Sequence, residues 1–166
     1  MILYHGSLEI IKEPNPFLGR KNVDFGQGFY LSDLREQAVR WLNRRKRTNP
    51  QKKGILNIYE YTENANLKIK KFGGYCEEWL DFVILNRTAG NISQNMDYDI
   101  VIGNVADDEV IVAVDNYVES LAKGRATGNT KLALLDELSF AHPNNQYAFK
   151  TVLSLASLKF TGYEEF

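Results

Sequence analysis

The spacing of hydrophobic residues along this 166-residue chain changes several times between strand-like and helix-like patterns. This feature constrains the fold more than any other. In residues 54–62, GILNIYEYT, apolar and polar side chains alternate, which is typical of a half-buried strand. Residues 98–103, YDIVIG, form a continuous apolar run of the kind found in buried strands. Between residues 110 and 121 the apolar side chains recur at helical spacing. Short strands mixed with helices predict an α+β domain.

The remaining segments follow the same rules. The pair Asp33 and Glu36 resembles a capping box, so we expect a helix there that ends before Pro50. Its predicted buried face consists of Leu34, Ala38, Trp41 and Leu42. Asp107 or Asp108 is the predicted cap of the helix over 110–121. Further strands are expected at 1–4, 29–31, 67–70, 146–150 and 159–160, and further helices around 79–84 and 132–138.

Length and charge describe an ordinary globular protein. No linker or repeat divides the chain, so we expect a single domain over residues 1–166. The net charge of −1 gives the whole molecule no strong attraction to nucleic acid or to an acidic membrane. No apolar run is long enough to span a membrane and no signal peptide is recognisable. A cytoplasmic protein is expected, with delivery into another cell by a leaderless route left open.

Cysteine and histidine are scarce, which limits the possible metal chemistry. Cys76 is the only cysteine, so an intrachain disulfide and a cysteine-based zinc cluster are impossible. His5 and His142 are the only histidines, and we therefore expect no metal site. The aspartates at 97, 99, 107 and 108 follow no known ligand spacing, and caps and turns explain them.

Three positions carry candidate chemistry, each beside an ordinary structural alternative. His5 can donate and accept hydrogen bonds near neutral pH, and Gly6 leaves its backbone open to a ligand; the alternative is a strand end before a turn. Tyr30, which follows Gly28, could stack on a planar ring or fill the core. Gln146, at the start of a late strand, can orient a hydroxyl but cannot act as a carboxylate base.

A basic run offers a different hypothesis. Residues 40–53 contain seven lysines and arginines that could bind phosphates of a nucleic acid. The ordinary alternative is a solvated helix end whose cations are favoured by the helix dipole. No aromatic residues are interleaved with the run for base stacking, which weakens the nucleic-acid interpretation.

The order of the candidate residues resembles the His-Tyr-Glu branch of the ADP-ribosyltransferases, the side of the superfamily that includes diphtheria toxin and the poly(ADP-ribose) polymerases. More closely, the whole chain resembles an uncharacterised bacterial family assigned to that superfamily. Four segments carry this resemblance in order: LYHGS at 3–7, GRKNVDFGQGFYLS at 19–32, YDIVIGNVADD at 98–108 and NNQYAF at 144–149.

The resemblance implies a split β-sandwich of two small packed sheets, with helices around it and NAD⁺ in the cleft. It implies that His5 binds the ribose hydroxyls, that Gly6 holds the nicotinamide amide through its backbone, and that Tyr30 stacks on the nicotinamide ring. Arg20 is the candidate partner of the pyrophosphate. The other implied pocket residues are Ser7, Asp24, Phe25, Gly26, Gly28 and Ser32.

Gln146 stands where the branch has glutamate. It can still bond a ribose hydroxyl, but it cannot deprotonate an acceptor or offset a cation with a full charge. The resemblance therefore implies a mono-ADP-ribosyltransferase with a protein or nucleic-acid acceptor and no metal. By analogy it is a toxin, with a partner antitoxin, or an effector. The alternatives are a non-catalytic NAD⁺ or ADP-ribose binding module and, third, a nucleic-acid-binding domain that uses residues 40–53.

Overall fold

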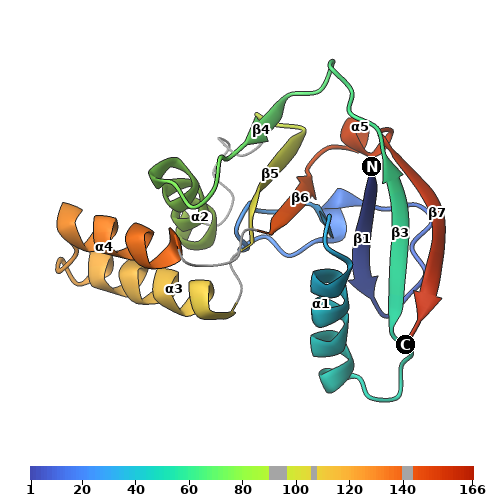
Figure 1. The fold of residues 1–166 in the computed structure, drawn as a ribbon, viewed down its shortest axis with the longest axis horizontal. Coiled ribbons are helices and arrows are strands. Elements are labelled where there is room, and N and C mark those ends of the chain that lie inside the picture. Colours follow the sequence, from blue (N-terminus) through green and yellow to red (C-terminus); the bar gives the residue numbers. More distant parts are fainter. Residues whose placement is uncertain (90–96, 106–107, 140–143) are drawn as a thin grey trace.

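The computed structural model describes residues 1–89, 97–105, 108–139 and 144–166 and confirms the α+β class (Figure 1). Its strands are β1 (Ile2–Ser7), β2 (Phe29–Ser32), β3 (Ile55–Tyr61), β4 (Ile69–Lys71), β5 (Ile100–Asn104), β6 (Asn145–Phe149) and β7 (Leu158–Glu165). Its helices are the 3-10 turn η1 (Pro16–Leu18), α1 (Arg35–Thr48), α2 (Glu77–Ala89), α3 (Asp108–Ala122), α4 (Gly128–Ser139) and α5 (Val152–Leu155).

All seven strands belong to one sheet with the order β4-β5-β6-β2-β1-β3-β7. Every neighbouring pair is antiparallel except β4 and β5. The sheet is narrow between β1 and β2, which are joined only through Tyr4 and Ser32, whereas β1 and β3 pair over six residues. Two halves result, β4-β5-β6-β2 and β1-β3-β7.

The two halves curve toward each other over a shared core. Tyr61 on β3 and Phe149 on β6 have ring centroids 5.6 Å apart, although their strands are three places apart in the sheet. In a flat sheet those strands would be separated by about 14 Å. The resemblance implied two separate sheets; the structure has one sheet with two facing halves. The core between them contains Leu3, Phe29, Leu31, Tyr59, Tyr61, Leu67, Ile100, Ile102, Tyr147 and Phe149.

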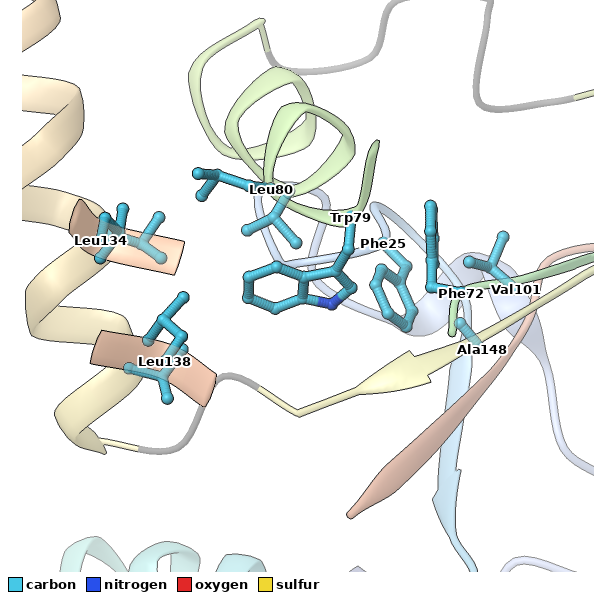
Figure 2. Close-up of a cluster of buried hydrophobic side chains, with 11 residues drawn as sticks. Phe25, Phe72, Trp79, Leu80, Val101, Leu134, Leu138 and Ala148 are labelled. Carbon is cyan, nitrogen blue, oxygen red and sulfur yellow. The ribbon is translucent and has the colours of Figure 1, made fainter. Parts of the chain in front are cut away.

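A second core lies between the opposite face of β5 and β6 and the helices α2, α3 and α4 (Figure 2). Trp79 of α2 is fully buried there, and its indole N–H donates to the carbonyl of Asn104 over 3.1 Å. Gly103 gives the aromatic rings room, because a Cβ at this position would lie 3.0 Å from the ring of Phe25 and 3.0 Å from that of Phe72. This layer buries Phe25, and so holds the part of the loop that leads into β2.

Helix α1 packs directly on the backbone of β1. A Cβ on Gly6 would lie only 2.2 Å from the carbonyl oxygen of Ala38, so the absence of a side chain at Gly6 permits the close approach. Ala38 and Leu42 are fully buried as expected, but Leu34 is 42% exposed and Trp41 faces the cleft described below.

The capping-box prediction for α1 is wrong. The cap residue is Leu34, which makes no side-chain cap bond, and Asp33 is directed toward Asn145. The hydroxyl of Ser32 accepts the N–H of Leu34 over 3.0 Å and closes the turn that leads into the helix.

Several element boundaries also differ, among them those of three strands. β1 continues to Ser7, so His5 and Gly6 lie within the strand rather than after it, because β3 pairs with the strand along its whole length. β4 begins at Ile69 rather than at residue 67. The final strand is eight residues long and runs beside β3. Asp107 and His142 lie outside the described residues.

Within the described part of the chain, every helix is too short or too polar to cross a membrane.

Candidate functional site

A cleft of about 1390 Å³ is lined by most of the residues that the sequence singled out. It is larger than the roughly 300–1,000 Å³ of most small-molecule sites. Its walls are formed by β1, β2 and β6, by the segment from Leu8 to Asp24, and by α1 and α2. His5, Tyr30 and Gln146, from three different strands, all line it. Gly6, Arg20, Asp24 and Gly28 line it as well.

His5 is held in one tautomer. Its Nδ1 lies 2.6 Å from the carbonyl oxygen of Tyr30, and because a carbonyl can only accept, Nδ1 carries the proton. Burial lowers the pKa of His5 to about 4, with a further contribution from the positive charge of Arg45, and the bond to Tyr30 opposes the shift. At neutral pH the imidazole is therefore uncharged, and Nε2 can accept a hydrogen bond. The ring rests against Phe29 with centroids 4.4 Å apart.

This low pKa makes a testable contribution to stability. The unfolded chain protonates His5 near pH 6.5 and the folded chain only near pH 4, so folding stability falls as the pH drops through that window. Between neutral pH and about pH 4.5, we expect the free energy of unfolding of His5→Gln to fall by about 1–3 kcal/mol less than that of the parent. Urea unfolding of parent and variant at neutral pH and near pH 4.5 measures it. Equal losses in both proteins would contradict the lowered pKa of His5.

The hydroxyl of Tyr30 is bonded within the protein, and its half-buried ring packs against the helix-covered core while Tyr30 also lines the cleft. It donates to the carbonyl of Gly26 over 2.6 Å and accepts the N–H of Phe25 over 3.1 Å. Burial, followed by the negative charge of Asp24, raises the pKa of Tyr30 well above its usual value, so the hydroxyl stays neutral. The loop before β2 is thus tied to the strand that it precedes.

Other bonds keep this loop rigid. Gly26 has φ +72°, and a Cβ there would lie 2.5 Å from Asn86 Oδ1. The ammonium of Lys150 donates to the carbonyl of Phe25, and burial lowers the pKa of Lys150 to about 8. The side chain of Gln27 donates to the carbonyls of Phe17 (2.6 Å) and Gly19 (3.1 Å).

Gln146 belongs to a chain of charged and polar groups. Its Nε2 donates to Asp24 Oδ2 over 3.1 Å. Arg87 donates to Asp24 Oδ1 from Nε (2.9 Å) and Nη2 (2.7 Å), and its Nη1 donates to Asp115 Oδ1 (2.9 Å). Asp24 and Gln146 are buried, at 7% and 4% exposed, whereas the side chain of Asp115 is 60% exposed.

The charge of the cleft favours an anionic ligand. Among its described lining residues, five are cationic and three are anionic, and Arg87 is paired with Asp24. Arg20 is close enough to Tyr30 for its positive charge to act on the pKa of that phenol. Arg44 and Arg45 extend from α1 into the same cleft beside Trp41.

Four of the residues implied by the resemblance are not among those that line the cleft. The hydroxyl of Ser7 closes a local turn with Glu9 and accepts from Asn57, and that of Ser32 donates to Gln37. Phe25 is fully buried in the helix-covered core. Gly26 is buried behind Tyr30. The structure places these four behind the residues that line the cleft, and their role in binding a ligand stays a prediction of the resemblance.

Sequence reasoning missed Arg87, Trp41, Arg44 and Arg45 as cleft residues. No sequence pattern marks Arg87 as a cleft residue, because the helical spacing in this segment is carried by its apolar residues. The basic run did identify Arg44 and Arg45, but not that they share a cleft with His5.

No group of three or more His, Cys, Asp or Glu side chains that could hold a metal ion occurs among the described residues. A second hollow of about 740 Å³ lies between α3 and α4 and contains none of the candidate residues.

Comparison with known proteins gives one match. The family profile described as "Protein of unknown function (DUF3990)" matches residues 1–160. No curated protein and no solved structure is similar enough to the chain to count as a match.

Proposed function

Since the chain belongs to the DUF3990 family of proteins of unknown function, we propose its activity from the site itself: it is an NAD⁺-dependent mono-ADP-ribosyltransferase. The observation that carries this proposal is the convergence of His5, Tyr30 and Gln146 on one cleft from β1, β2 and β6. These are the three positions that correspond to the His, Tyr and Glu of the branch, with Gln146 in the place of the glutamate. The narrow junction between two facing half-sheets fits the split β-sandwich of that superfamily.

The geometry fits the parts of a dinucleotide. The neutral His5 offers Nε2 as an acceptor to a ribose hydroxyl, because Nδ1 is already used. The ring of Tyr30 offers a stacking surface for nicotinamide, which contributes about 1 kcal/mol beyond the buried area. Arg20, Arg44 and Arg45 supply positive charge for the two phosphates. Gly6 lines the cleft, where its backbone would hold the nicotinamide amide.

In the proposed reaction the bond between ribose C1′ and the nicotinamide nitrogen breaks, and nicotinamide leaves with the electron pair. The ribose passes through an oxocarbenium-like state, an acceptor nucleophile forms the new bond to C1′, and the acceptor releases a proton. Gln146 provides a dipole rather than a charge at this site, which favours a single transfer over polymer growth.

The acceptor is a protein or a nucleic acid. Part of the basic run serves the fold: Lys46 donates to the carbonyl of Phe166 over 2.9 Å, and Lys53 pairs with Glu165. Arg44 and Arg45 instead line the cleft, where they would meet the phosphates of NAD⁺ or of a nucleic-acid acceptor. If the function were nucleic-acid binding alone, the affinity for nucleic acid would fall steeply as the salt concentration rises. This salt dependence would weaken in a variant in which Arg44 and Arg45 are neutralised.

Nicotinamide release from NAD⁺ tests the proposal. We expect the parent protein to release nicotinamide, and Gln146→Ala and Tyr30→Ala to reduce the rate about 100-fold or more. Tyr163→Ala is the matched control, because Tyr163 is 44% exposed on β7 and does not line the cleft. Tyr30→Phe keeps the ring and should bind NAD⁺ better than Tyr30→Ala, which separates stacking from loop anchoring.

Calorimetric titration with NAD⁺ separates the alternatives. Saturable binding without nicotinamide release would support the non-catalytic binding module. If His5→Ala and Tyr30→Ala bind NAD⁺ as tightly as the parent, the assignment of the site is wrong.

A further inference from the structure

We propose that Asp24 is the positioning residue for Gln146: it fixes the side-chain amide with its oxygen directed away from Asp24 and polarises it. This inference rests on the proposed function, because it takes the amide oxygen of Gln146 to bond a ribose hydroxyl of NAD⁺, as the resemblance implies. It explains how a glutamine can occupy the position of a glutamate, and why glutamine suits this site.

The orientation of the amide follows from hydrogen-bond chemistry. Gln146 lies 3.1 Å from Asp24 Oδ2, in a bond between buried groups. An ionised carboxylate can only accept, so the amide must present Nε2 to Asp24, and Oε1 must lie on the other side of the amide group. A lone glutamine could rotate and exchange the two atoms. Here that exchange would bring an oxygen against a carboxylate, which is repulsive.

Asp24 is itself held in place. Arg87 occupies Oδ1 with two donors, so Oδ2 is directed to Gln146. The neighbouring Phe25 is fully buried, and its N–H is bonded to the hydroxyl of Tyr30. The same loop therefore positions the tyrosine ring and, through Asp24, the glutamine amide.

The network also accounts for the charge. Asp24 places a carboxylate directly behind the amide, which strengthens its oxygen as an acceptor. A glutamate at position 146 would bring a second carboxylate to about 3 Å from the first, and two such groups cannot both ionise without a large rise in one pKa. The charged or titratable groups that line this cleft are His5, Glu9, Lys12, Glu13, Arg20, Asp24, Tyr30, Arg44, Arg45 and Arg87.

The first arm of the test needs no activity. In the Gln146→Glu variant the new carboxyl group shares its site with Asp24, which raises its folded-state pKa. The folded state then binds more protons than the unfolded chain above about pH 4.3, and stability falls as the pH rises. We expect the melting temperature of Gln146→Glu, relative to the parent, to drop between about pH 5 and pH 8. The Asp24→Asn/Gln146→Glu double variant, with one carboxylate in the pair, should lose this drop. If the melting temperature of Gln146→Glu changes between about pH 5 and pH 8 as that of the parent does, the proposal is overturned.

The second arm measures function. We expect Asp24→Asn to bind NAD⁺ within about threefold of the parent by calorimetry, and its kcat for nicotinamide release to fall about tenfold to a hundredfold. We expect kcat to fall because an asparagine at position 24 can donate as well as accept, so the side-chain amide of Gln146 is free to rotate and exchange its oxygen and nitrogen. Asp81→Asn is the matched control: it lies on the same helix as Arg87, pairs with Lys131 and does not line the cleft.

The outcomes separate the two proposals. An Asp24→Asn variant with the parent's kcat overturns the positioning role while the transferase stands. A parent that neither binds NAD⁺ nor releases nicotinamide defeats the proposed function, and the assigned reaction role falls with it. The melting temperatures of Gln146→Glu and of the double variant still decide whether Asp24 holds position 146.

Discussion

Arg87→Ala should lower the free energy of unfolding by about 3 kcal/mol, the lower end of the range for breaking a buried ion pair. The side chains of Arg87 and Asp24 are only 18% and 10% exposed, so water can solvate little of the Asp24 carboxylate when Arg87 is removed. Removing the guanidinium takes from the buried carboxylate of Asp24 its ion pair with Arg87. Urea unfolding at neutral pH measures the loss.

A double variant identifies the cause. Arg87→Ala combined with Asp24→Asn should recover part of the loss, because the buried charge is removed with its partner. Lys123→Ala is the surface control: its pair with Glu119 is 51% and 62% exposed and should contribute less than about 1 kcal/mol. If Arg87→Ala and Lys123→Ala were equally stable, the Asp24–Arg87 pair would not be a structural element of the cleft.

Gly6→Ala should cost about 3 kcal/mol, at the upper end of the range for overpacking. The new methyl group would lie 2.2 Å from the carbonyl oxygen of Ala38 and 3.0 Å from both the backbone nitrogen and Cβ of Leu42. Backbone atoms in a helix cannot rotate away, so α1 would have to move off β1. Thermal and urea unfolding both report the effect.

Gly162→Ala is the matched control for Gly6→Ala. Gly162 also lies in a strand, β7, but a Cβ there would meet no atom within 4 Å. This substitution should change stability by less than about 0.5 kcal/mol. Equal effects at the two glycines would show that α1 does not pack on β1 as described. The contact also gives Gly6 a structural reason to be glycine, independent of any ligand.

Much of the fold could be predicted because local patterns and tertiary packing agree. The alternation in residues 54–62 predicted β3, which is Ile55–Tyr61, although Leu56, on the opposite face from Tyr59 and Tyr61, is fully buried as well. The apolar stripe from Val110 to Leu121 lies within α3, and its buried members Val110 and Val114 face the second core. The narrow junction of the sheet could not be predicted, because strand pairing depends on contacts between distant segments.

The candidate site divides in the same way. His5, Tyr30 and Gln146 could be found because their order along the chain carried a resemblance, and the structure brings all three to the cleft. The bond from Arg87 to Asp24 joins residues 63 positions apart, and no local pattern marks it. Ser7 and Ser32 were placed in the pocket by analogy, whereas a hydroxyl two residues before a free N–H often closes a turn, as both do here.

The single residue pair between β1 and β2 has a consequence for how the molecule holds together. With so little shared backbone bonding, cohesion across the junction depends on side chains, among them the bond from His5 to the carbonyl of Tyr30 and the stacking of His5 on Phe29. A molecule that fills the cleft contacts β1 on one side and β2 and β6 on the other. It would act as a removable cross-link, so that the two half-sheets unfold as one cooperative unit when it is bound and more independently when it is not.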